Sequence, residues 1–327
     1  MLSVKTDFGA VGDGITDDTA ALQAACNSGS EVYLDQCVGY KITSTLNVTS
    51  SVSLIGPKTR VKILPTGNLA QIFNIQAYNV AIEGIYVNNV ANTTPASTVF
   101  YLNNNSTFIG QLSFFNIQGT SCCNIFIDAG NPKLLIVDVK IKQCYFTGST
   151  GRGILFQSVF AFLIMDTVLF DSINASNNSP QIALINNQGC FASNVFIASN
   201  NVNSTGQYGW YLQNCAAIHL ERCHVDTIGG TAYYFNQVSD SQFNHLTCGL
   251  MNQHGIICAN MYNSIFTNVT IIGRRGVPPT AAGCIGLYVL SGCSDLIFNA
   301  FIILNMSGQA SYITQGSPYV QVSNFVD

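Results

Sequence analysis

The chain has 327 residues, of which 48% are hydrophobic and 9% are charged, and its formal net charge is −4. Its 12 Lys and Arg residues are scattered, so it lacks the basic stripe that binds nucleic acid. No apolar run reaches the roughly 18 residues that a membrane-spanning helix needs, which predicts no membrane insertion. The opening residues MLSVKTDFGA lack the apolar stretch of a secretory signal, so no signal peptide is expected.

The first segment with a clear pattern covers residues 7–22, DFGAVGDGITDDTAAL, and it contains both turn and helix signals. Its three glycines suit tight turns, and Asp17 or Asp18 is placed to cap a helix over residues 19–26. An amphipathic helix at this point would cover the open end of a solenoid core. We therefore predict that residues 1–45 form an N-terminal segment with a capping helix.

This segment closely resembles the N-terminal motif of the pectate-lyase-like β-helix superfamily, which includes tailspike depolymerases of bacteriophages and some microbial glycan-cleaving enzymes. The resemblance implies a right-handed parallel β-helix that binds, and commonly cleaves, a bacterial surface polysaccharide. It also implies a homotrimer, a tail adaptor protein as partner and a place in the virion tail if the chain is phage-encoded, and an extracellular location otherwise. The motif is a cap in that family, so its acidic residues are expected to be structural.

After this segment, a six-residue pattern, apolar-x-x-apolar-x-apolar, recurs along the chain. It begins at Ile82, Ile109, Ile141, Met165, Ala192, Leu220, Phe243, Phe266, Phe298 and Val322. A second pattern, apolar-x-apolar-polar, ends its apolar pair at Leu102, Ile127, Phe156, Ile185, Leu212, Phe235, Cys258 and Val289. Alternating segments rich in Ile, Val, Phe and Tyr favour short strands. With the resemblance, they predict that residues 46–327 form one continuous domain, an all-β, right-handed, single-stranded parallel β-helix of about ten or more coils.

The register also sorts residues into core and surface. Trp210 is predicted inside the core, and the 12 cysteines fall at apolar positions, so we expect reduced core residues rather than disulfides. Variable connections at 172–181, 198–207 and 271–283 are rich in turn-forming residues, and loops of this kind commonly carry binding sites. Large outward residues, namely Leu169, Phe196 and Ile302, suggest that one sheet face is buried against a partner subunit.

Candidate catalytic residues follow from the chemistry of glycan hydrolysis, which generally needs two carboxyl groups about 5–10 Å apart. Alignment of the coils puts Asp166 and Glu221 at one outward position, and Asp171 and Asp226 at another. The members of each pair are two coils, and therefore roughly 10 Å, apart. Glu221 and Asp226 are favoured because they share a coil with His224 and face the variable loops.

Substrate-binding candidates surround these carboxylates or lie on the neighbouring strand. Arg222, His224 and His245 are expected beside the acidic residues, with His224 on the same face as Glu221 and Asp226. Tyr211 and Tyr234 occupy the outward position of the second strand, where their rings are available to stack on sugars. No recognisable metal-ligand spacing is present, so no metal site and no cofactor are expected for hydrolysis.

Two classes of function remain open. The first is a polysaccharide-cleaving enzyme, with hydrolysis favoured over β-elimination. By the resemblance, a lyase often uses Arg or Lys as base and often holds Ca²⁺ on acidic residues, so Arg222 is either a candidate base or the ion-pair partner of a neighbouring carboxylate. The second is a non-enzymatic glycan-binding or structural virion or adhesin module, because any solenoid needs an outward ladder of polar residues to stay soluble. Convergence of Asp171, Glu221 and Asp226 on one groove would favour an enzyme, and separation would favour a binding module.

Overall fold

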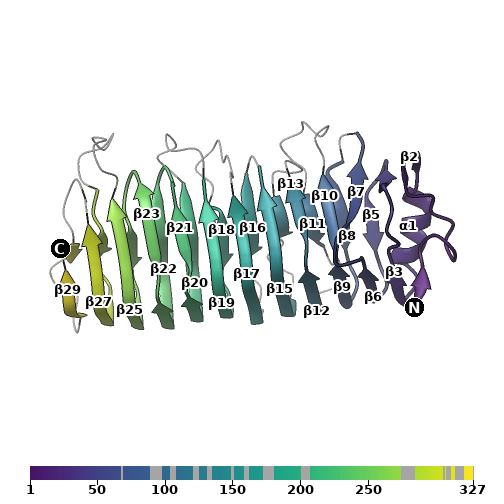
Figure 1. Cartoon of the computed structure of the whole chain (residues 1–327). Coiled ribbons are helices and arrows are strands. Elements are labelled where there is room, and N and C mark those ends of the chain that lie inside the picture. The colour runs from purple at the N-terminus through teal and green to yellow at the C-terminus, as the bar shows by residue number, and fades with distance from the viewer. Residues whose placement is uncertain are drawn as a thin grey trace. The chain divides into compact units, whose positions relative to one another are not determined.

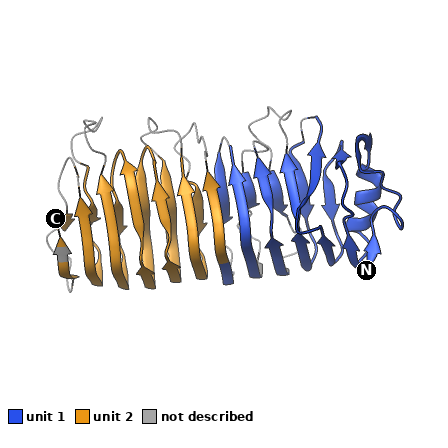
Figure 2. Ribbon diagram, in the orientation of Figure 1, with its two compact units in different colours: residues 1–164 blue, residues 165–327 orange. Residues whose placement is uncertain are grey.

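The chain forms two compact units, residues 1–164 and residues 165–327 (Figure 2). The computed structural model describes residues 1–67, 69–88, 98–103, 108–120, 125–130, 135–148, 151–157, 162–171, 180–199, 207–273, 284–304, 306, 311–313 and 320–326. This part leaves out most of the three predicted loops, namely residues 172–179, 200–206 and 274–283. The predicted division at residue 45 falls within the first unit and stays a prediction.

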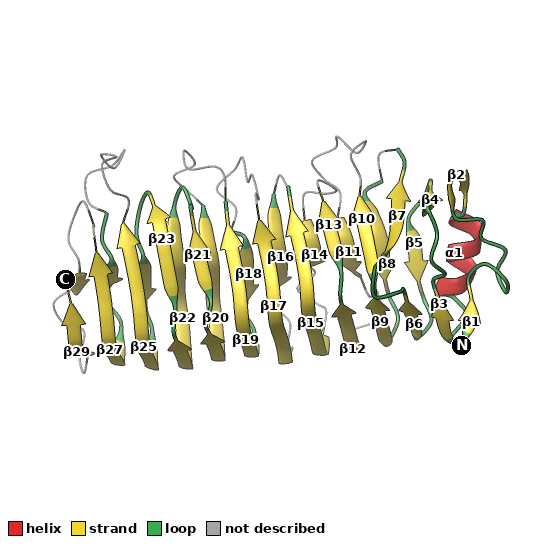
Figure 3. Ribbon diagram, viewed as in Figure 1, coloured by secondary structure: helices red, strands yellow, loops and turns green. Residues whose placement is uncertain are grey.

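The first unit begins with a cap. Its helix α1 (Thr19–Cys26) has the predicted bounds and lies at the N-terminal end of the unit (Figure 3). The helix buries Leu22, Ala25 and Cys26 against the strands that follow it. The Asp18 carboxylate accepts the N–H groups of the preceding turn at 2.7 and 3.0 Å, which ties that turn to the start of the helix. The predicted capping helix is therefore confirmed.

The strands of the first unit form three parallel sheets, one strand of each per coil (Figure 1). Sheet 1 contains β1 (Leu2–Ser3), β3 (Glu31–Tyr33), β6 (Val52–Ile55), β9 (Asn79–Glu83), β12 (Phe108–Phe115) and the first part of β15 (Leu135–Thr147). Sheet 2 contains β2 (Asp13–Asp17), β4 (Gly39–Ile42), β7 (Val61–Pro65), β10 (Ile85–Asn88), β13 (Gln118–Thr120) and the last part of β15. Sheet 3 contains β5 (Leu46–Val48), β8 (Gln71–Ile75), β11 (Thr98–Leu102), β14 (Ile125–Ala129) and β16 (Arg152–Gln157).

The second unit is built in the same way, with longer strands that pass from one sheet to the next. Sheet 1 contains β17 (Phe162–Asp171), β19 (Gln188–Ala198), β20 (Tyr208–Glu221), β22 (Thr231–Asn244), β25 (Tyr262–Gly273), β27 (Ser294–Leu304) and β29 (Val320–Val326). Sheet 2 contains β21 (His224–Asp226), β23 (Thr247–Met251) and the ends of several sheet 1 strands. Sheet 3 contains β18 (Ile182–Ile185), the starts of β20 and β22, β24 (Ile256–Ala259), β26 (Leu287–Val289) and β28 (Ser311–Ile313).

The core of the second unit follows the predicted register. The repeat starts from Ala192 to Val322 pair in sequence, each with the equivalent residue of the next coil. The Phe243 and Phe266 rings stack with centroids 4.5 Å apart, and Phe298 continues the stack at 4.8 Å. Trp210 is fully buried, as predicted. The alternation of inward and outward residues was thus sufficient to predict this register, because each large apolar residue packs inside the solenoid on the equivalent residue of the next coil.

Three predicted positions are wrong. Phe114, and not Ile109, pairs with both Ile82 and Ile141. The cause is Gly119, which fills the sixth, inward position of that coil, so the apolar pattern matched five residues too early. In the second pattern, two predicted end positions are also wrong. The equivalent of Phe156 is Ala129, two residues after Ile127, and the equivalent of Leu212 is Leu184, one residue before Ile185.

A left-handed residue turns the chain from sheet 1 to sheet 2 in successive coils of the second unit. Asn194, Arg222, His245 and Asn268 occupy this position, with φ between 51° and 54°. Thr167 and Ala300 hold the same position in other coils, with φ of 56° and 58°. Asparagine and histidine tolerate this conformation better than most residues, whereas Arg222 does not belong to the favoured types. This corner positions the residues discussed below.

Ten cysteines of the described residues are free thiols, and all of them except Cys37 are buried. This agrees with the predicted reduced core, while Cys122 and Cys123 lie outside the described residues. Within the same part of the chain, no helix is long and apolar enough to span a membrane.

Candidate functional site

Glu221 is the centre of a polar cluster in the second unit. It is the last residue of β20, and its side chain is 18% exposed. Its Oε1 lies 3.4 Å from His245 Nδ1 and 3.7 Å from Arg222 Nε, and its Oε2 accepts a hydrogen bond from Asn244 Nδ2 at 2.7 Å. Nitrogen groups of three side chains therefore surround the Glu221 carboxylate, two on Oε1 and one on Oε2.

Asp166 shares the outward column of Glu221, as predicted. Ser193 pairs in register with Glu221, and Ser193 Oγ donates to Asp166 Oδ1 at 3.0 Å. Asp166 Oδ1 also accepts hydrogen bonds from Asn194 Nδ2 and Thr167 Oγ1, both at 3.2 Å. The two carboxylates therefore stand two strands, or about 10 Å, apart, with a short serine between them.

His224 and Asp226 form a second cluster on β21. Their side chains approach to 3.9 Å between Nε2 and Oδ2, and His224 Nδ1 is hydrogen-bonded to Thr247 Oγ1. The Phe196 ring stacks on the imidazole, with centroids 4.7 Å apart and planes 15° apart. Burial lowers the pKa of His224 against the opposing effect of Asp226, so this imidazole is neutral at pH 7.

The structure separates residues that the sequence placed together. Glu221 ends a strand of sheet 1, whereas His224 and Asp226 lie on sheet 2, beyond the corner at Arg222. The prediction that these three residues share one face is therefore wrong, because the left-handed turn lies between them. In the described residues, no hydrogen bond or ion pair joins the Glu221 and Asp226 side chains. Asp171 ends β17, half-buried, five residues after Asp166.

Tyr211 and Tyr234 lie on a third surface, sheet 3. Their rings stack with centroids 5.3 Å apart and planes 5° apart, and Tyr208 packs against both. Tyr211 Oη donates to Gln213 Oε1 at 2.8 Å. Burial raises the pKa of Tyr208 and of Tyr211, so both rings are neutral at physiological pH. The three form an aromatic surface at the opposite end of β20 from Glu221.

The sequence did not identify the residues that hold these groups in place. Asn244 and Ser193 are ordinary outward polar residues, and only the coil register reveals that they touch Glu221 and Asp166. Phe196 was noted as a large outward residue, but its contact with His224 was not foreseen. The usable signal was the register itself, which places Phe196, His224 and Thr247 in one column.

A calcium site, which a lyase often uses, does not fit the donors around these residues. Ca²⁺ binds six to eight oxygen ligands, typically with several carboxylates. Glu221 faces a guanidinium and an imidazole, and Asp226 faces an imidazole. Within the described residues, no group of three His, Cys, Asp or Glu side chains is placed to hold a metal ion.

Comparison with solved structures identifies several similar folds at low sequence identity. A Geobacillus virus E2 protein, ORF18, has a TM-score of 0.50 and 15% identity over 99% of this chain, which spans 61% of the viral chain. The catalytic unit of an alpha-1,3-glucanase from Streptomyces thermodiastaticus has a TM-score of 0.51 and 12% identity over 100% of this chain and 68% of its own. The surface protein and adhesin PfbA of Streptococcus pneumoniae has a TM-score of 0.51 and 13% identity over 100% of both chains. These likenesses establish the fold.

Sequence comparison gives the family. No curated protein matches the chain. The family model described as right handed beta helix region matches residues 181–326, which confirms the predicted hand of the solenoid. The model described as rhamnogalacturonase A/epimerase, pectate lyase-like, matches residues 1–228, well over half of the chain. The resemblance seen in the N-terminal motif is thereby confirmed, and the chain belongs to the rhamnogalacturonase A/epimerase, pectate-lyase-like family of right-handed β-helix proteins.

Proposed function

We propose that this chain is a tailspike-like protein that binds a bacterial surface polysaccharide along its second unit and cleaves it by hydrolysis. The observation that carries the proposal is the shared column of Asp166 and Glu221, with Ser193 between them. Inverting glycosidases hold their two carboxyl groups about 6.5–9.5 Å apart to leave room for water. A backbone separation of about 10 Å brings two flexible carboxylate side chains into that range.

The proposal gives each carboxylate one role. Glu221, held by Arg222, His245 and Asn244, is the base that takes a proton from the attacking water. Asp166, which shares the outward column of Glu221 two strands away, is the acid that gives a proton to the departing glycosidic oxygen. The water oxygen bonds to the anomeric carbon as the glycosidic bond breaks, so the two protons and the bond changes balance.

Elimination is less well supported than hydrolysis. A lyase base must be free to accept a proton, but the Arg222 guanidinium already pairs with the Glu221 carboxylate, with 3.7 Å between Nε and Oε1. The donors around the acidic residues also do not suit Ca²⁺.

The similar folds support a role in glycan contact at surfaces. The glucanase shows that a fold of this kind serves a glycan-cleaving enzyme, and ORF18 of Geobacillus virus E2 shows that a similar fold occurs in a viral protein. A homotrimer, a tail adaptor partner and a virion-tail location are parts of the proposal that rest on the family resemblance. The outward Phe196 and Ile302 side chains, 37% and 41% exposed, are available for contacts between subunits.

A non-enzymatic glycan-binding module is the second candidate, and two observations favour it. Glu221 and Asp226 lie on different sheets, and each candidate carboxylate already has partners within the protein. The adhesin PfbA shows that a similar fold occurs in a surface adhesin. In this alternative the Tyr208, Tyr211 and Tyr234 surface stacks on sugars without any cleavage.

One experiment separates these alternatives. The purified chain is incubated with a panel of capsular and O-antigen polysaccharides, and both new reducing ends and unsaturated uronate absorbance are measured. We expect reducing ends without that absorbance, and their loss in Glu221→Gln and Asp166→Asn. Asp295→Asn, an exposed carboxylate on the same unit, is the matched control and should keep full activity. Binding without any new reducing ends would favour the adhesin-like module, and uronate absorbance would favour a lyase.

A further inference from the structure

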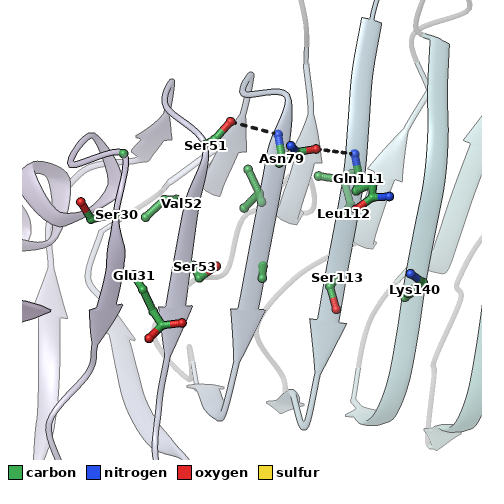
Figure 4. A pocket seen from close by; sticks show the side chains of 13 residues that line it. Ser30, Glu31, Ser51, Val52, Ser53, Asn79, Gln111, Leu112, Ser113 and Lys140 are labelled. Atoms are coloured by element: carbon green, nitrogen blue, oxygen red, sulfur yellow. Dashed lines mark hydrogen bonds between the residues drawn. The ribbon is translucent and has the colours of Figure 1, made fainter. Parts of the chain in front are cut away.

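Sheet 1 of the first unit carries a cleft of about 450 Å³ that no candidate residue above touches. It crosses β3, β6, β9, β12 and β15 (Figure 4). Figure 4 shows Glu31 near one end of the cleft and Lys140 near the other, with Ser53 and Ser113 between them. All five strands belong to one unit, so the cleft is a feature of a single sheet face.

Small side chains create this cleft. Glu31, Ser53, Ala81, Ser113 and Lys140 occupy one outward column, each paired in register with the next. Three short side chains in a row between two long ones leave a trough on the sheet surface. Four strand spacings separate its ends, which makes it about 19 Å long. That length suits an extended ligand lying across the strands.

The rim of the cleft is a row of hydrogen-bonding groups. Ser51 Oγ accepts the Asn79 N–H at 3.3 Å, and Asn79 Oδ1 accepts the Gln111 N–H at 3.1 Å, which orients the Asn79 amide. Asp138 pairs in register with Gln111 and continues this row. Its Oδ2 binds Lys140 Nζ at 3.1 Å, while its buried Oδ1 has no hydrogen-bond partner in the described residues.

An aromatic ring stands beside this rim. Tyr78 is 51% exposed, and its ring lies against Gly110, where a Cβ would come within 2.5 Å of the ring. The backbone N–H groups of Gly110 and Gln111 both donate to the Tyr78 carbonyl, at 2.7 and 3.1 Å. The absence of a side chain at Gly110 therefore lets the tyrosine ring lie beside the hydrogen-bonding row.

We propose that this cleft binds a short neutral oligosaccharide. Serine hydroxyls and amides both donate and accept, as sugar hydroxyls do, and the Tyr78 ring offers an apolar face for a sugar ring. Acidic glycans are disfavoured because Asp138 already neutralises Lys140 and Glu31 adds a negative charge. The site differs from the proposed cleavage site in the second unit, and it would serve to hold the polymer rather than to cut it.

The test fills the cleft. Binding of neutral gluco- and chito-oligosaccharides and of acidic oligogalacturonate to the full chain is measured by isothermal titration calorimetry. We expect a neutral oligosaccharide to bind, and Ala81→Trp to weaken that binding at least tenfold, or about 1.4 kcal/mol. Gln242→Trp, an exposed outward position on sheet 1 of the second unit, is the matched control and should bind like wild type. Gln111→Ala leaves the short side chains of Ser53, Ala81 and Ser113 unchanged and should also weaken binding. It keeps the test valid if the tryptophan variant does not fold.

Three results would overturn the inference: no neutral oligosaccharide binds, oligogalacturonate binds more tightly than the neutral ligands, or Ala81→Trp binds like wild type. These outcomes are independent of the proposed cleavage. Glu221→Gln should abolish the release of reducing ends while the cleft still binds, so failure of one proposal is distinguishable from failure of the other.

Discussion

Asn244 donates a hydrogen bond to Glu221 across neighbouring strands, with 2.7 Å between Nδ2 and Oε2. The same amide accepts hydrogen bonds on its Oδ1 from Thr267 Oγ1 at 2.8 Å and from Asn268 Nδ2 at 3.2 Å. These two donors fix which end of the amide faces Glu221. Asn244 is therefore a positioning residue, because it acts on the proposed base and not on the substrate.

Asn244→Ala should lower kcat at least tenfold with little change in KM, since the Glu221 carboxylate loses its oriented donor. The free energy of unfolding should fall by about 1 kcal/mol, the usual worth of one hydrogen bond. Asn299→Ala is the matched control, because Asn299 occupies the same column and accepts equivalent hydrogen bonds from Ser323 and Asn324. Equal loss of activity in both variants would mean that Asn244 has a structural role alone.

Tyr233 supports the corner from within the core. Its buried hydroxyl is hydrogen-bonded to the carbonyl oxygens of Cys223 at 2.8 Å and Thr247 at 3.1 Å. Cys223 precedes His224 in the chain, and Thr247 pairs with His224 in the sheet. Tyr233→Phe should lower the free energy of unfolding by about 1 kcal/mol and also reduce cleavage. Tyr40→Phe removes a similar buried bond, to the Asp35 carbonyl, in the first unit and should reduce stability only. Urea denaturation together with the reducing-end assay checks both variants.

The sequence predicted the fold further than it predicted the site. Alternation is sufficient to set register wherever a coil places large apolar residues inside, as at Leu220 and Phe243. It fails at Gly119, because a glycine can occupy an inward position without an apolar side chain. The family motif at the N-terminus identified the cap because a specific local sequence is needed for its turns.

The site was only partly predictable because charge was used as the guide. The shared column of Asp166 and Glu221 followed from register, but the corner at Arg222 depends on a backbone φ of 51° that arginine rarely adopts. The cleft on the first unit was not predicted, because short uncharged side chains create it. Its defining feature is the short side chain at Ser53, Ala81 and Ser113, which a search for ionisable residues passes over.

The stacked tyrosines on sheet 3 offer a separate test of glycan binding. Tyr234→Ala removes one ring of the 5.3 Å stack and should weaken binding of a polysaccharide substrate several-fold, raising KM with kcat nearly unchanged. Tyr211→Phe keeps the ring and loses only the hydrogen bond to Gln213, so it should bind almost like wild type. If both variants weaken binding by the same factor, the hydroxyls and not the ring faces contact the sugar.

His254 gives the fold a pH dependence whose sign follows from its environment. Burial lowers its pKa below the usual value of about 6.5, and its Nδ1 accepts the Ile285 N–H at 3.1 Å. Because the unfolded chain binds the proton more readily, this contribution to stability is complete above about pH 6.5 and is lost as the pH falls through the lower folded value. The thermal midpoint of the wild type should therefore decrease as the pH is lowered from 7.5 to 5.

His254→Gln keeps an acceptor for Ile285 without a titrating ring, so its midpoint should fall less over the same range. His219→Gln, on sheet 1 away from this contact, reports the effect of any exchange of histidine for glutamine. The decisive quantity is the difference in midpoint between His254→Gln and the wild type, which should shift in favour of the variant as the pH is lowered. A difference that stays constant from pH 7.5 to pH 5 would show that His254 does not control this loss of stability.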